Sequence, residues 1–473
     1  MTDSTALGAV APPSSAATAP AAPAAPAGEV AAAPPLPGFW QAFAYWLRLG
    51  FISFGGPAGQ IAIMHAELVE KRRWISEQRF LHALNYCMVL PGPEAQQLAT
   101  YLGWLMHRTR GGLAAGMLFV LPSLLILLGL CWVYMAFGQV PAVAGVLYGI
   151  KPAVTAIVVA AAHRIGSRTL RSTATRAIAL LAFVAIFALA LPFPLIVLTA
   201  GLLGLLGARL APAQFAVGAA HGARVQALGS AAIDDHTPSP PHARFRWARF
   251  ARVLALGLGL WLLSLALLVQ WWGWDSTLAQ MGWFFTKAAL LTFGGAYAVL
   301  PYVYQGAVEH FQWLSPLQMV DALALGETTP GPLIMVVSIV GFIGGWSQAL
   351  LGPDALLLAG ALAATVATFF TFLPSFVFIF LGGPLIESTH GKLQFTAPLT
   401  GISAAVVGVI ANLALFFAWH VLWPQGLGGR FEWPALAIGL LAGLALFRFR
   451  QGVIAVVLGA GLAGLAWQLL GRL

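Results

Sequence analysis

Carboxylate side chains lie next to helix-breaking residues inside long apolar stretches of this sequence. Glu94 directly follows a Pro-Gly-Pro run at residues 91–93, and Glu327 lies three residues before a second such run at 330–332. Asp321 lies about two helical turns before the second run. Ionisable groups within membrane segments indicate functional sites, so we interpret all three as candidates for protonatable coupling groups. The structural alternative is that each carboxylate forms a salt bridge or caps a half-helix.

Two cations lie at matching places in the apolar stretches. Arg48 and Lys287 each lie six residues before the phenylalanine of a Phe-Gly-Gly run. A cation in such a stretch is costly and again indicates a function. A substrate anion held between two related halves would take one positive charge from each. The alternatives are that these side chains snorkel to the membrane interface or pair with the acidic residues.

A pair of glycines follows each cation. Gly55 and Gly56 precede Pro57 in the first half, and Gly294 and Gly295 take the same place in the second. Glycine lets a ligand approach the bare backbone. The half-helix that begins after such a break has a partly positive N-terminus, which binds anions. The alternative is that the glycines allow close helix packing.

The composition indicates the kind of fold that must position these residues. Of 473 residues, 60% are apolar and 8% are charged, whereas soluble domains carry about 25% charged residues. The runs at 113–137, 177–206 and 253–270 approach or exceed the roughly 20 apolar residues of a membrane helix. We therefore predict an all-α polytopic membrane protein with about 11–13 membrane segments.

An internal repeat relates the two halves of the chain. The Phe-Gly-Gly runs at 54–56 and 293–295 are separated by 239 positions, as are the two Pro-Gly-Pro runs. Leu-Pro-Ser at 121–123 recurs 252 positions later, so the second half carries 13 inserted residues, which we place around 344–356. Paired, interrupted apolar segments at corresponding positions point to the binding site of a transporter.

The loops predict how the two halves are oriented. Basic loops at 70–79, 107–110 and 163–176 are typical of the cytoplasmic side. Because the first two flank residues 80–106, this segment is predicted to enter the membrane and return at its Pro-Gly-Pro run. A Pro-kinked crossing helix is the alternative. The loops at 304–313 and 344–356 contain no Lys or Arg and are predicted to be external, so we expect inverted repeats with broken or re-entrant helices.

Composition shifts divide the chain into five parts. Residues 1–37 are an Ala/Pro-rich tail that we expect to be disordered. The N-terminal transport repeat then covers 38–208, and a basic cytoplasmic linker covers 209–252. An extra membrane span at 253–275 supplies the change of side, and the C-terminal transport repeat covers 276–473.

Other kinds of chemistry lack their sequence patterns. The Lys and Arg residues behind the net charge of +9 lie in short loops, which marks topology and does not predict a nucleic-acid partner. The sequence contains no phosphate-binding loop, no His-Glu-x-x-His motif and no convincing Cys/His ligand set. We therefore predict no catalytic residues, no metal and no cofactor, and expect that the protein is not an enzyme.

Three stretches resemble the chromate ion transporter (CHR) family of the long-chain, two-domain type. They are "LRLGFISFGGP", "LPGPEAQQLATYLGW" and "KAALLTFGGAYAVLPYV", the last followed by "ALGETTPGPLIMVVSIVGF". The resemblance runs from about residue 39 to 471 and implies a secondary transporter in the bacterial inner membrane that exports chromate and gives chromate resistance. The alternative is an importer or exchanger of sulfate or another oxyanion with coupled cations. A homodimer is left open.

The resemblance and the breaks together define the candidate site. This sequence departs from the family pattern at Gln60 and Met88, where many members have His and Gln. We expect the substrate to be bound by Arg48, Ser53, Phe54, Gly55, Gly56, Pro57, Pro91, Gly92, Pro93, Lys287, Thr292, Gly294, Gly295, Pro330, Gly331 and Pro332. The coupling candidates are Glu94, Glu327 and Asp321.

Overall fold

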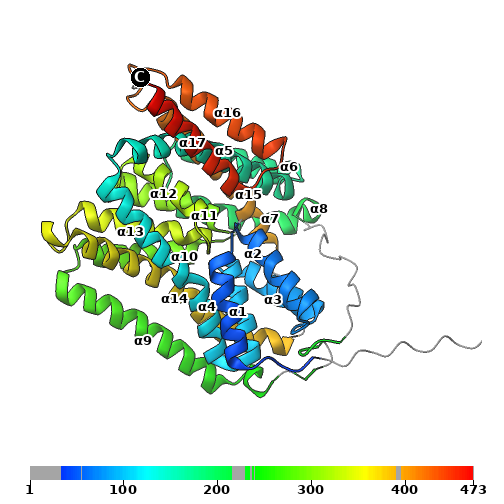
Figure 1. Ribbon diagram of the computed structural model, residues 1–473. Coiled ribbons are helices and arrows are strands. Elements are labelled where there is room, and N and C mark those ends of the chain that lie inside the picture. The colour runs from blue at the N-terminus through cyan, green and yellow to red at the C-terminus, as the bar shows by residue number, and fades with distance from the viewer. Residues whose placement is uncertain are drawn as a thin grey trace, which may run out of the picture.

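The computed structural model describes residues 34–54, 56–215, 230–234, 237–238, 240–293, 295–389 and 396–471. Within these ranges the chain is helical, and its one β-bridge joins Ile75 to Ile233 (Figure 1). Residues 1–33 of the predicted tail lie outside them, as do Gly55 and Gly294. The predicted all-α membrane fold is confirmed.

Helices of different lengths follow one another in the same order in the two halves. The first half contains α1 (Phe39–Ile52), α2 (Gly56–His65), η1 (Ala66–Lys71), α3 (Glu77–Val89), α4 (Glu94–Phe137), α5 (Pro141–Thr169), α6 (Thr173–Phe187), α7 (Phe193–Leu210) and the short α8 (Pro212–Phe215). After η2 (Pro241–Ala243) and α9 (Trp247–Trp272), the second half contains α10 (Thr277–Leu291), α11 (Ala296–Tyr304), η3 (Gln305–His310), α12 (Pro316–Thr328), η4 (Leu333–Met335), α13 (Val336–Ser347), η5 (Pro353–Ala355), α14 (Leu356–Thr389), α15 (Thr396–Leu422), α16 (Trp433–Phe447) and α17 (Val453–Leu470).

The structure reproduces the repeat read from the sequence. Helices α3 and α12 both have 13 residues and begin 239 positions apart. The single-turn π-helices η1 and η3 are related by the same shift. Two homologous halves are therefore present in the fold as well as in the sequence.

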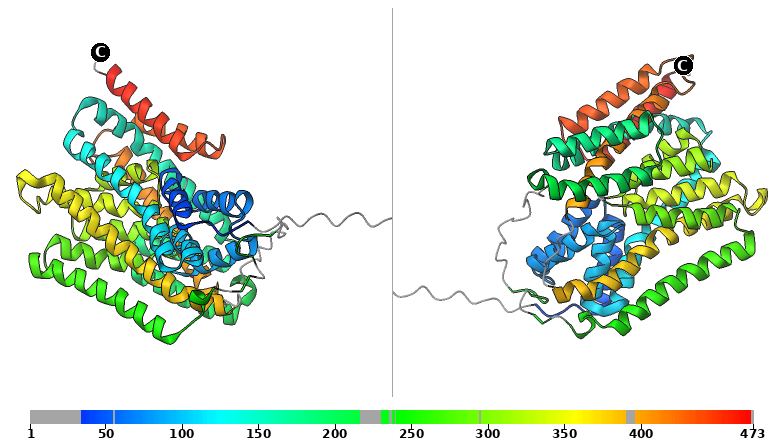
Figure 2. Two further views of the ribbon diagram at one scale, coloured as in Figure 1. Left: turned by 60° about the horizontal axis from the view of Figure 1, so that its bottom comes forward. Right: turned by 180° about the vertical axis from the view of Figure 1, so that it is seen from behind.

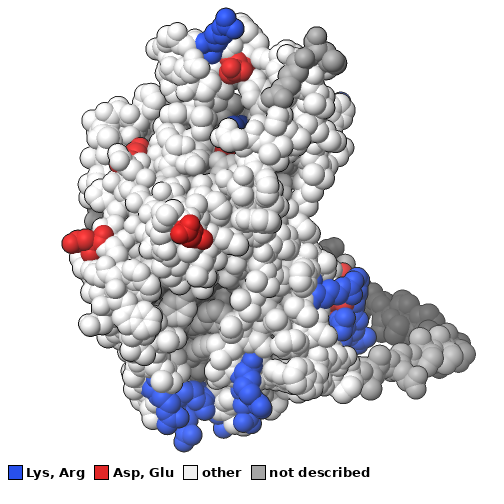
Figure 3. Space-filling view, turned by 60° about the vertical axis from the view of Figure 1, so that its left-hand side comes forward, with Lys and Arg blue, Asp and Glu red and all other residues white. Residues whose placement is uncertain are grey.

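Seven helices among the described residues are long and apolar enough to cross a membrane. They lie within α4, α5, α7, α9, α14, α15 and α17. The outer surface is accordingly poor in charge, and on the face in Figure 3 the Lys and Arg side chains gather at the edges, while a few Asp and Glu side chains lie in the otherwise uncharged area between them. Helix α9 lies at the periphery (Figure 1), where only 6% of its apolar window is buried.

Helix α4 is folded back on itself. Its backbone is non-helical at His107 and Arg108. Gly103 and Gly111 on either side of this turn lie so close that a Cβ added to Gly103 would come within 2.5 Å of the Gly111 carbonyl oxygen. Residues 94–106 therefore form a short helix beside the long helix 109–137. In the second half these two helices are α13 and α14, joined by the longer connection that contains η5.

The short helices on either side of residues 91–93 form a re-entrant hairpin. Each has 13 residues and is about 20 Å long, which is too short for a hydrocarbon core of about 30 Å. Arg79 at the start of α3 and Tyr101 near the end of the returning helix both bind the carboxylate of Glu387. Both ends of the hairpin therefore lie on the same side, and the alternative of a kinked crossing helix is wrong. Helices α12 and α13 repeat the hairpin, and Trp313 contacts Gly344 at its open end.

The homologous long helices run in opposite directions. An added Cβ would meet Phe380 at Gly112 and Phe376 at Gly116, so α4 and the C-terminal part of α14 lie antiparallel. Since α14 is the repeat of 109–137 in α4, a rotation that superimposes the halves must invert one of them. The inverted arrangement of the repeats is confirmed.

The last two helices of each half pack against the other half. Helices α16 and α17 lie on α5, and α6 and α7 lie on α15 (Figures 1 and 2). Glycines allow the close approach in both places: Gly149 contacts Gly464, and Gly401 contacts Gly204. Each half is thereby completed by helices of the other, although the predicted domain boundaries stay a prediction.

The inverted halves predict a membrane topology. Tags at Arg73 and Arg168 should report cytoplasm, and tags at His310 and Gln348 should report periplasm, because only the first pair lies in basic loops. Cysteine accessibility in intact cells and in inverted vesicles measures each position. A cytoplasmic signal at His310 would contradict the predicted orientation.

Candidate functional site

The four chain breaks contact one another in two pairs, which we together call the crossing point. It comprises residues 53–56, 91–93, 292–295 and 330–332, of which the structure describes all but Gly55 and Gly294. The Gly92 N–H donates to the Thr292 carbonyl at 2.7 Å, and the Gly331 N–H donates to the Ser53 carbonyl at 2.8 Å. These two bonds are related by the repeat. Each Pro-Gly-Pro run therefore binds the Phe-Gly-Gly break of the other half.

The glycines of the Pro-Gly-Pro runs have no room for a side chain. Gly92 has a φ of 126° and Gly331 a φ of 105°, a region that L-residues rarely adopt. A Cβ added to Gly92 would come within 2.5 Å of the Ser375 Oγ, and one added to Gly331 within 2.6 Å of the Ser123 Cβ. The two serines belong to the repeated Leu-Pro-Ser motif, so this contact is also exchanged between the halves.

Polar side chains complete the crossing point. The Gln60 Nε2 donates to the Gly331 carbonyl at 2.6 Å, and the Gln97 Nε2 donates to the Pro91 carbonyl at 2.7 Å. The Ser53 and Thr292 hydroxyls donate to carbonyls of their own helices, α1 and α10. These two hydroxyls therefore bond to the last turns of their half-helices, while Gln60 and Gln97 bond to carbonyls of the Pro-Gly-Pro runs.

Open space lies beside the second glycine of each Gly-Gly pair. A Cβ added to Gly56 or Gly295 would meet nothing within 4 Å, and both glycines have positive φ. Gly295 is nevertheless buried. Gly56 is the first residue of α2 and Gly295 is the N-cap of α11, and the first turns of both helices carry free N–H groups. At each of the two breaks, the space therefore lies where an anion would meet the positive end of a half-helix.

The other predicted site residues near the breaks are prolines and a phenylalanine. Pro93 and Pro332 each precede the first residue of a helix, α4 and η4 respectively. Pro330 is buried, while Phe54 and Pro57 are half-buried beside the open space.

The structure does not bring Arg48 and Lys287 to the crossing point. Both are exposed on the outer surface of the chain. Arg48 lies beside the exposed Leu47 and Phe51, and the Lys287 Nζ lies 5.6 Å from the centre of the Trp283 ring. These surroundings favour the snorkelling alternative, and a role of the two cations in substrate binding stays a prediction.

Two of the three acidic candidates have contrasting surroundings. Asp321 is buried, lies 3.3 Å from the Lys151 Nζ and accepts a hydrogen bond from the Tyr134 hydroxyl at 2.8 Å. Its partner is thus Lys151, not the Arg48 or Lys287 of the structural alternative. Glu94 is the half-buried first residue of α4 and makes no hydrogen bond or ion pair within the described chain. Glu94 therefore remains available as a coupling group.

Glu327 belongs to a cluster that the sequence did not reveal. Its carboxylate accepts a hydrogen bond from the Tyr297 hydroxyl. The positive charge of Arg164, from α5, acts on both groups. Tyr297 follows Gly295 by two residues, so this cluster adjoins the open space at the second break.

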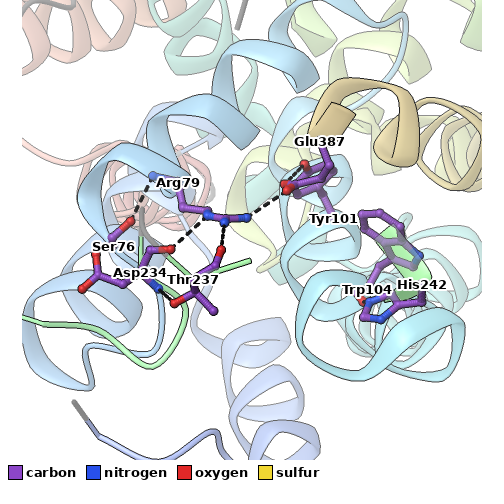
Figure 4. Close-up of polar contacts among 8 residues, drawn as sticks. All are labelled: Ser76, Arg79, Tyr101, Trp104, Asp234, Thr237, His242 and Glu387. Carbon is purple, nitrogen blue, oxygen red and sulfur yellow. Dashed lines mark hydrogen bonds and ion pairs between the residues drawn. The ribbon is translucent and has the colours of Figure 1, made fainter. Parts of the chain in front are cut away.

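A second polar cluster ties the open end of the first hairpin to the other half (Figure 4). The Arg79 guanidinium lies 2.8 Å from the Glu387 carboxylate and also donates to the carbonyls of Asp234 and Thr237. The linker therefore lies against the first hairpin through Arg79.

His242 adds a second contact between the linker and the hairpin. Burial lowers the pKa of His242, so the ring is neutral at pH 7 and donates to the Trp104 carbonyl. The described part of the linker is thus a structural element of this end of the hairpin.

The glycine geometry yields a test. Gly331→Ala and Gly92→Ala should each lower the thermal stability and abolish transport, since a Cβ would break a bond between the halves as well as strain the backbone by about 1–3 kcal/mol. Gly129→Ala is the control, because its added Cβ meets nothing within 4 Å. Fluorescence size-exclusion and a thermal melt measure the effect. If Gly331→Ala, Gly92→Ala and Gly129→Ala all unfold at the wild-type melting temperature, the two hydrogen bonds between the halves do not stabilise the protein.

Comparisons with known proteins identify the family. The family model described as "Chromate transporter" matches residues 40–205 and 279–465. The chain is 34% identical over 442 residues to a "Chromate transport protein" of Pseudomonas aeruginosa, covering 92% of this chain and 93% of the relative. It is 30% identical over 427 residues to one of Cupriavidus metallidurans, covering 90% and 92%. No solved structure matches. With its two matched halves joined at the crossing point, the chain belongs to the chromate transporter family.

Proposed function

We propose that the protein exports chromate, a tetrahedral dianion, across the bacterial inner membrane and thereby gives chromate resistance. The family and the names of its relatives support chromate as the substrate. The observation that carries the proposal is the crossing point, where two helix N-termini border open space at Gly56 and Gly295.

The crossing point suits a tetrahedral oxyanion for a physical reason. Backbone N–H groups at helix N-termini bind oxyanions without a bulky side chain, and the dipole favours negative charge. The inverted halves offer one such terminus each, beside Gly56 and beside Gly295. Half-helix N-termini at corresponding places of two repeats are typical of the anion sites of transporters.

The membrane potential favours export. Moving one charge through 100 mV is worth about 2.3 kcal/mol, so a dianion that leaves an inside-negative cell gains roughly 4.6 kcal/mol. The potential alone is therefore sufficient to drive export, and a coupled ion is not needed for its energy.

Glu94 favours a second candidate function. Because its carboxylate has no partner within the described residues, it can bind a proton that moves with the substrate. An importer or exchanger of sulfate or another oxyanion with coupled cations would need such a group.

Direction and substrate can be measured together. Inverted vesicles should accumulate labelled chromate when their interior is made positive, and collapse of the potential should reduce uptake, because export is driven by charge. Sulfate in excess tests competition for the same site. Uptake that follows a proton gradient and not the potential would favour the coupled importer.

Glu94→Gln tests the coupling role separately. The substitution removes the charge with little change in shape, so chromate transport should lose its dependence on pH between 6 and 8 at fixed potential. Retention of chromate with slower release is the second expected effect, because the carboxylate no longer competes with the dianion. A variant equal to the wild type at every pH would show that Glu94 is only a helix cap.

A further inference from the structure

We propose that Lys151 binds the transported oxyanion, that its ion pair with Asp321 is the anion-free state of this site, and that Asp321 takes up a proton when the anion binds. The inference rests on the proposed function and names a second place, between α5 and the second hairpin, at which the protein recognises its substrate.

Three helices from both halves bring this site together. Asp321 lies on α12 of the second half, while Lys151 lies on α5 and Tyr134 on α4 of the first half. The Lys151 Nζ lies 3.3 Å from the Asp321 Oδ2, and the Tyr134 hydroxyl donates to the same oxygen at 2.8 Å. Both partners of Asp321 therefore bind one oxygen of its carboxylate.

The site lies deep within a membrane segment. Lys151 is about 15 Å from the start of α5 and about 27 Å from its end, whereas the hydrocarbon core is about 30 Å thick. Asp321 is about 10 Å from the end of α12, where the chain approaches the second Pro-Gly-Pro run. Ionised side chains at such depth face the protein interior or a water-filled cavity, and they mark ion pathways.

The two members of the ion pair are unequally buried. The Lys151 side chain is 24% exposed, and the Asp321 side chain is 4% exposed. An ammonium group has three N–H donors, and within the described chain Lys151 uses one of them, for Asp321. The other two donors and the positive charge are therefore available to a small anion that reaches the exposed side of Lys151.

The Asp321 carboxylate has an oxygen that can receive a proton. Its Oδ1 is buried and has no hydrogen-bond partner among the described residues. An anion bound to Lys151 would bring a second negative charge next to Asp321, and like charges at this distance favour the protonated carboxyl. Asp321 therefore binds a proton on Oδ1 as the anion arrives, while Oδ2 keeps the hydrogen bond from Tyr134. The proton leaves again when Lys151 returns to Asp321.

Few other groups act on this proton. Lys151 and Tyr134 are the titratable groups that contact Asp321. Helices α13 and α17, which also pack on α12, contain no titratable residue, and the His420 ring of α15 bonds to a carbonyl of its own helix. On α12 itself, Glu327 lies about 9 Å further along the helix.

The first hairpin has no equivalent of this site within the described residues. The repeat places Ser403 opposite Lys151 and His82 opposite Asp321. The ion pair at the first hairpin involves Arg79, whose side chain is 13% exposed and also donates to two carbonyls of the linker. Arg79 is thus engaged in structural contacts, whereas Lys151 keeps free donors.

Binding to the purified full-length protein tests the proposal, with chromate and sulfate as the titrated probes. Lys151→Gln should weaken chromate binding about tenfold or more, since a charge-assisted contact is lost. Lys151→Arg should bind more tightly than Lys151→Gln, because it keeps the positive charge. Asp321→Asn should bind chromate more tightly than the wild type, because no carboxylate competes for Lys151.

Proton uptake is a second readout, which a purely structural ion pair would not give. A pH indicator in weakly buffered solution should record protons taken up as the wild type binds chromate. Asp321→Asn should take up fewer protons, because its amide cannot be protonated in this range. Equal proton uptake by the wild type and Asp321→Asn would show that Asp321 is not the group that binds the proton.

The double variant Lys151→Gln/Asp321→Asn separates anion binding from fold stabilisation. It removes both charges, so it leaves no buried charge without a partner, and replacing a buried ion pair in this way is often tolerated. We expect it to fold and yet to bind and carry chromate as poorly as Lys151→Gln. Recovery of wild-type binding and transport would show that the ion pair only stabilises the structure.

Arg168→Gln is the matched control, since it removes an exposed cation from the same helix. Wild-type affinity for chromate in a folded Lys151→Gln variant overturns the proposal and leaves the proposed function intact. If the wild type binds sulfate but neither binds nor carries chromate, while Lys151→Gln loses sulfate binding, the proposed substrate is wrong and the role of Lys151 stands.

Discussion

Backbone hydrogen bonds at the breaks are the constraint on which this structure depends. Within hydrocarbon, a chain that leaves its helix must satisfy its peptide groups inside the protein. Each Pro-Gly-Pro run has only one N–H, that of Gly92 or Gly331, because proline has none. Each is given to a carbonyl at the end of a half-helix in the other repeat. Each bond thus joins the one N–H of a Pro-Gly-Pro run to a carbonyl at the break of the other repeat.

This exchange makes the two halves dependent on each other. A repeat alone would lose the bond that the other repeat's glycine donates to the Ser53 or Thr292 carbonyl, and it would also lack the terminal helices that cover α5 or α15. The two-fold relation of the halves follows from the same bonds, since a pair of equivalent contacts between two equivalent segments requires it. The breaks beside Gly56 and Gly295 are therefore each held in place by the other half.

The sequence predicted the structure well where residues act through their backbone conformation. Proline and glycine determine chain breaks wherever they occur, so the repeat, the re-entrant hairpins and the meeting of the breaks could be predicted. The sequence was less informative about where charged side chains lie in the structure. Arg48 and Lys287 match in the repeat, yet helix rotation places both on the outer surface. Arg164 was hidden among the basic residues of a predicted loop, and no sequence pattern reveals that its charge acts on Glu327.

Ion pairs at opposite ends of α4 bear on how the crossing point opens. Arg79–Glu387 ties the start of α3 to α14, and Lys151–Asp321 ties α12 to α5, next to Tyr134 near the end of α4. Both pairs join one half to the other. Their carboxylates are 5% and 4% exposed, and to separate such a pair leaves a buried charge uncompensated, at about 3–5 kcal/mol. The two ends of the structure are thus tied by ion pairs of similar burial. A movement that separates one pair while the other stays intact costs about half as much as separating both.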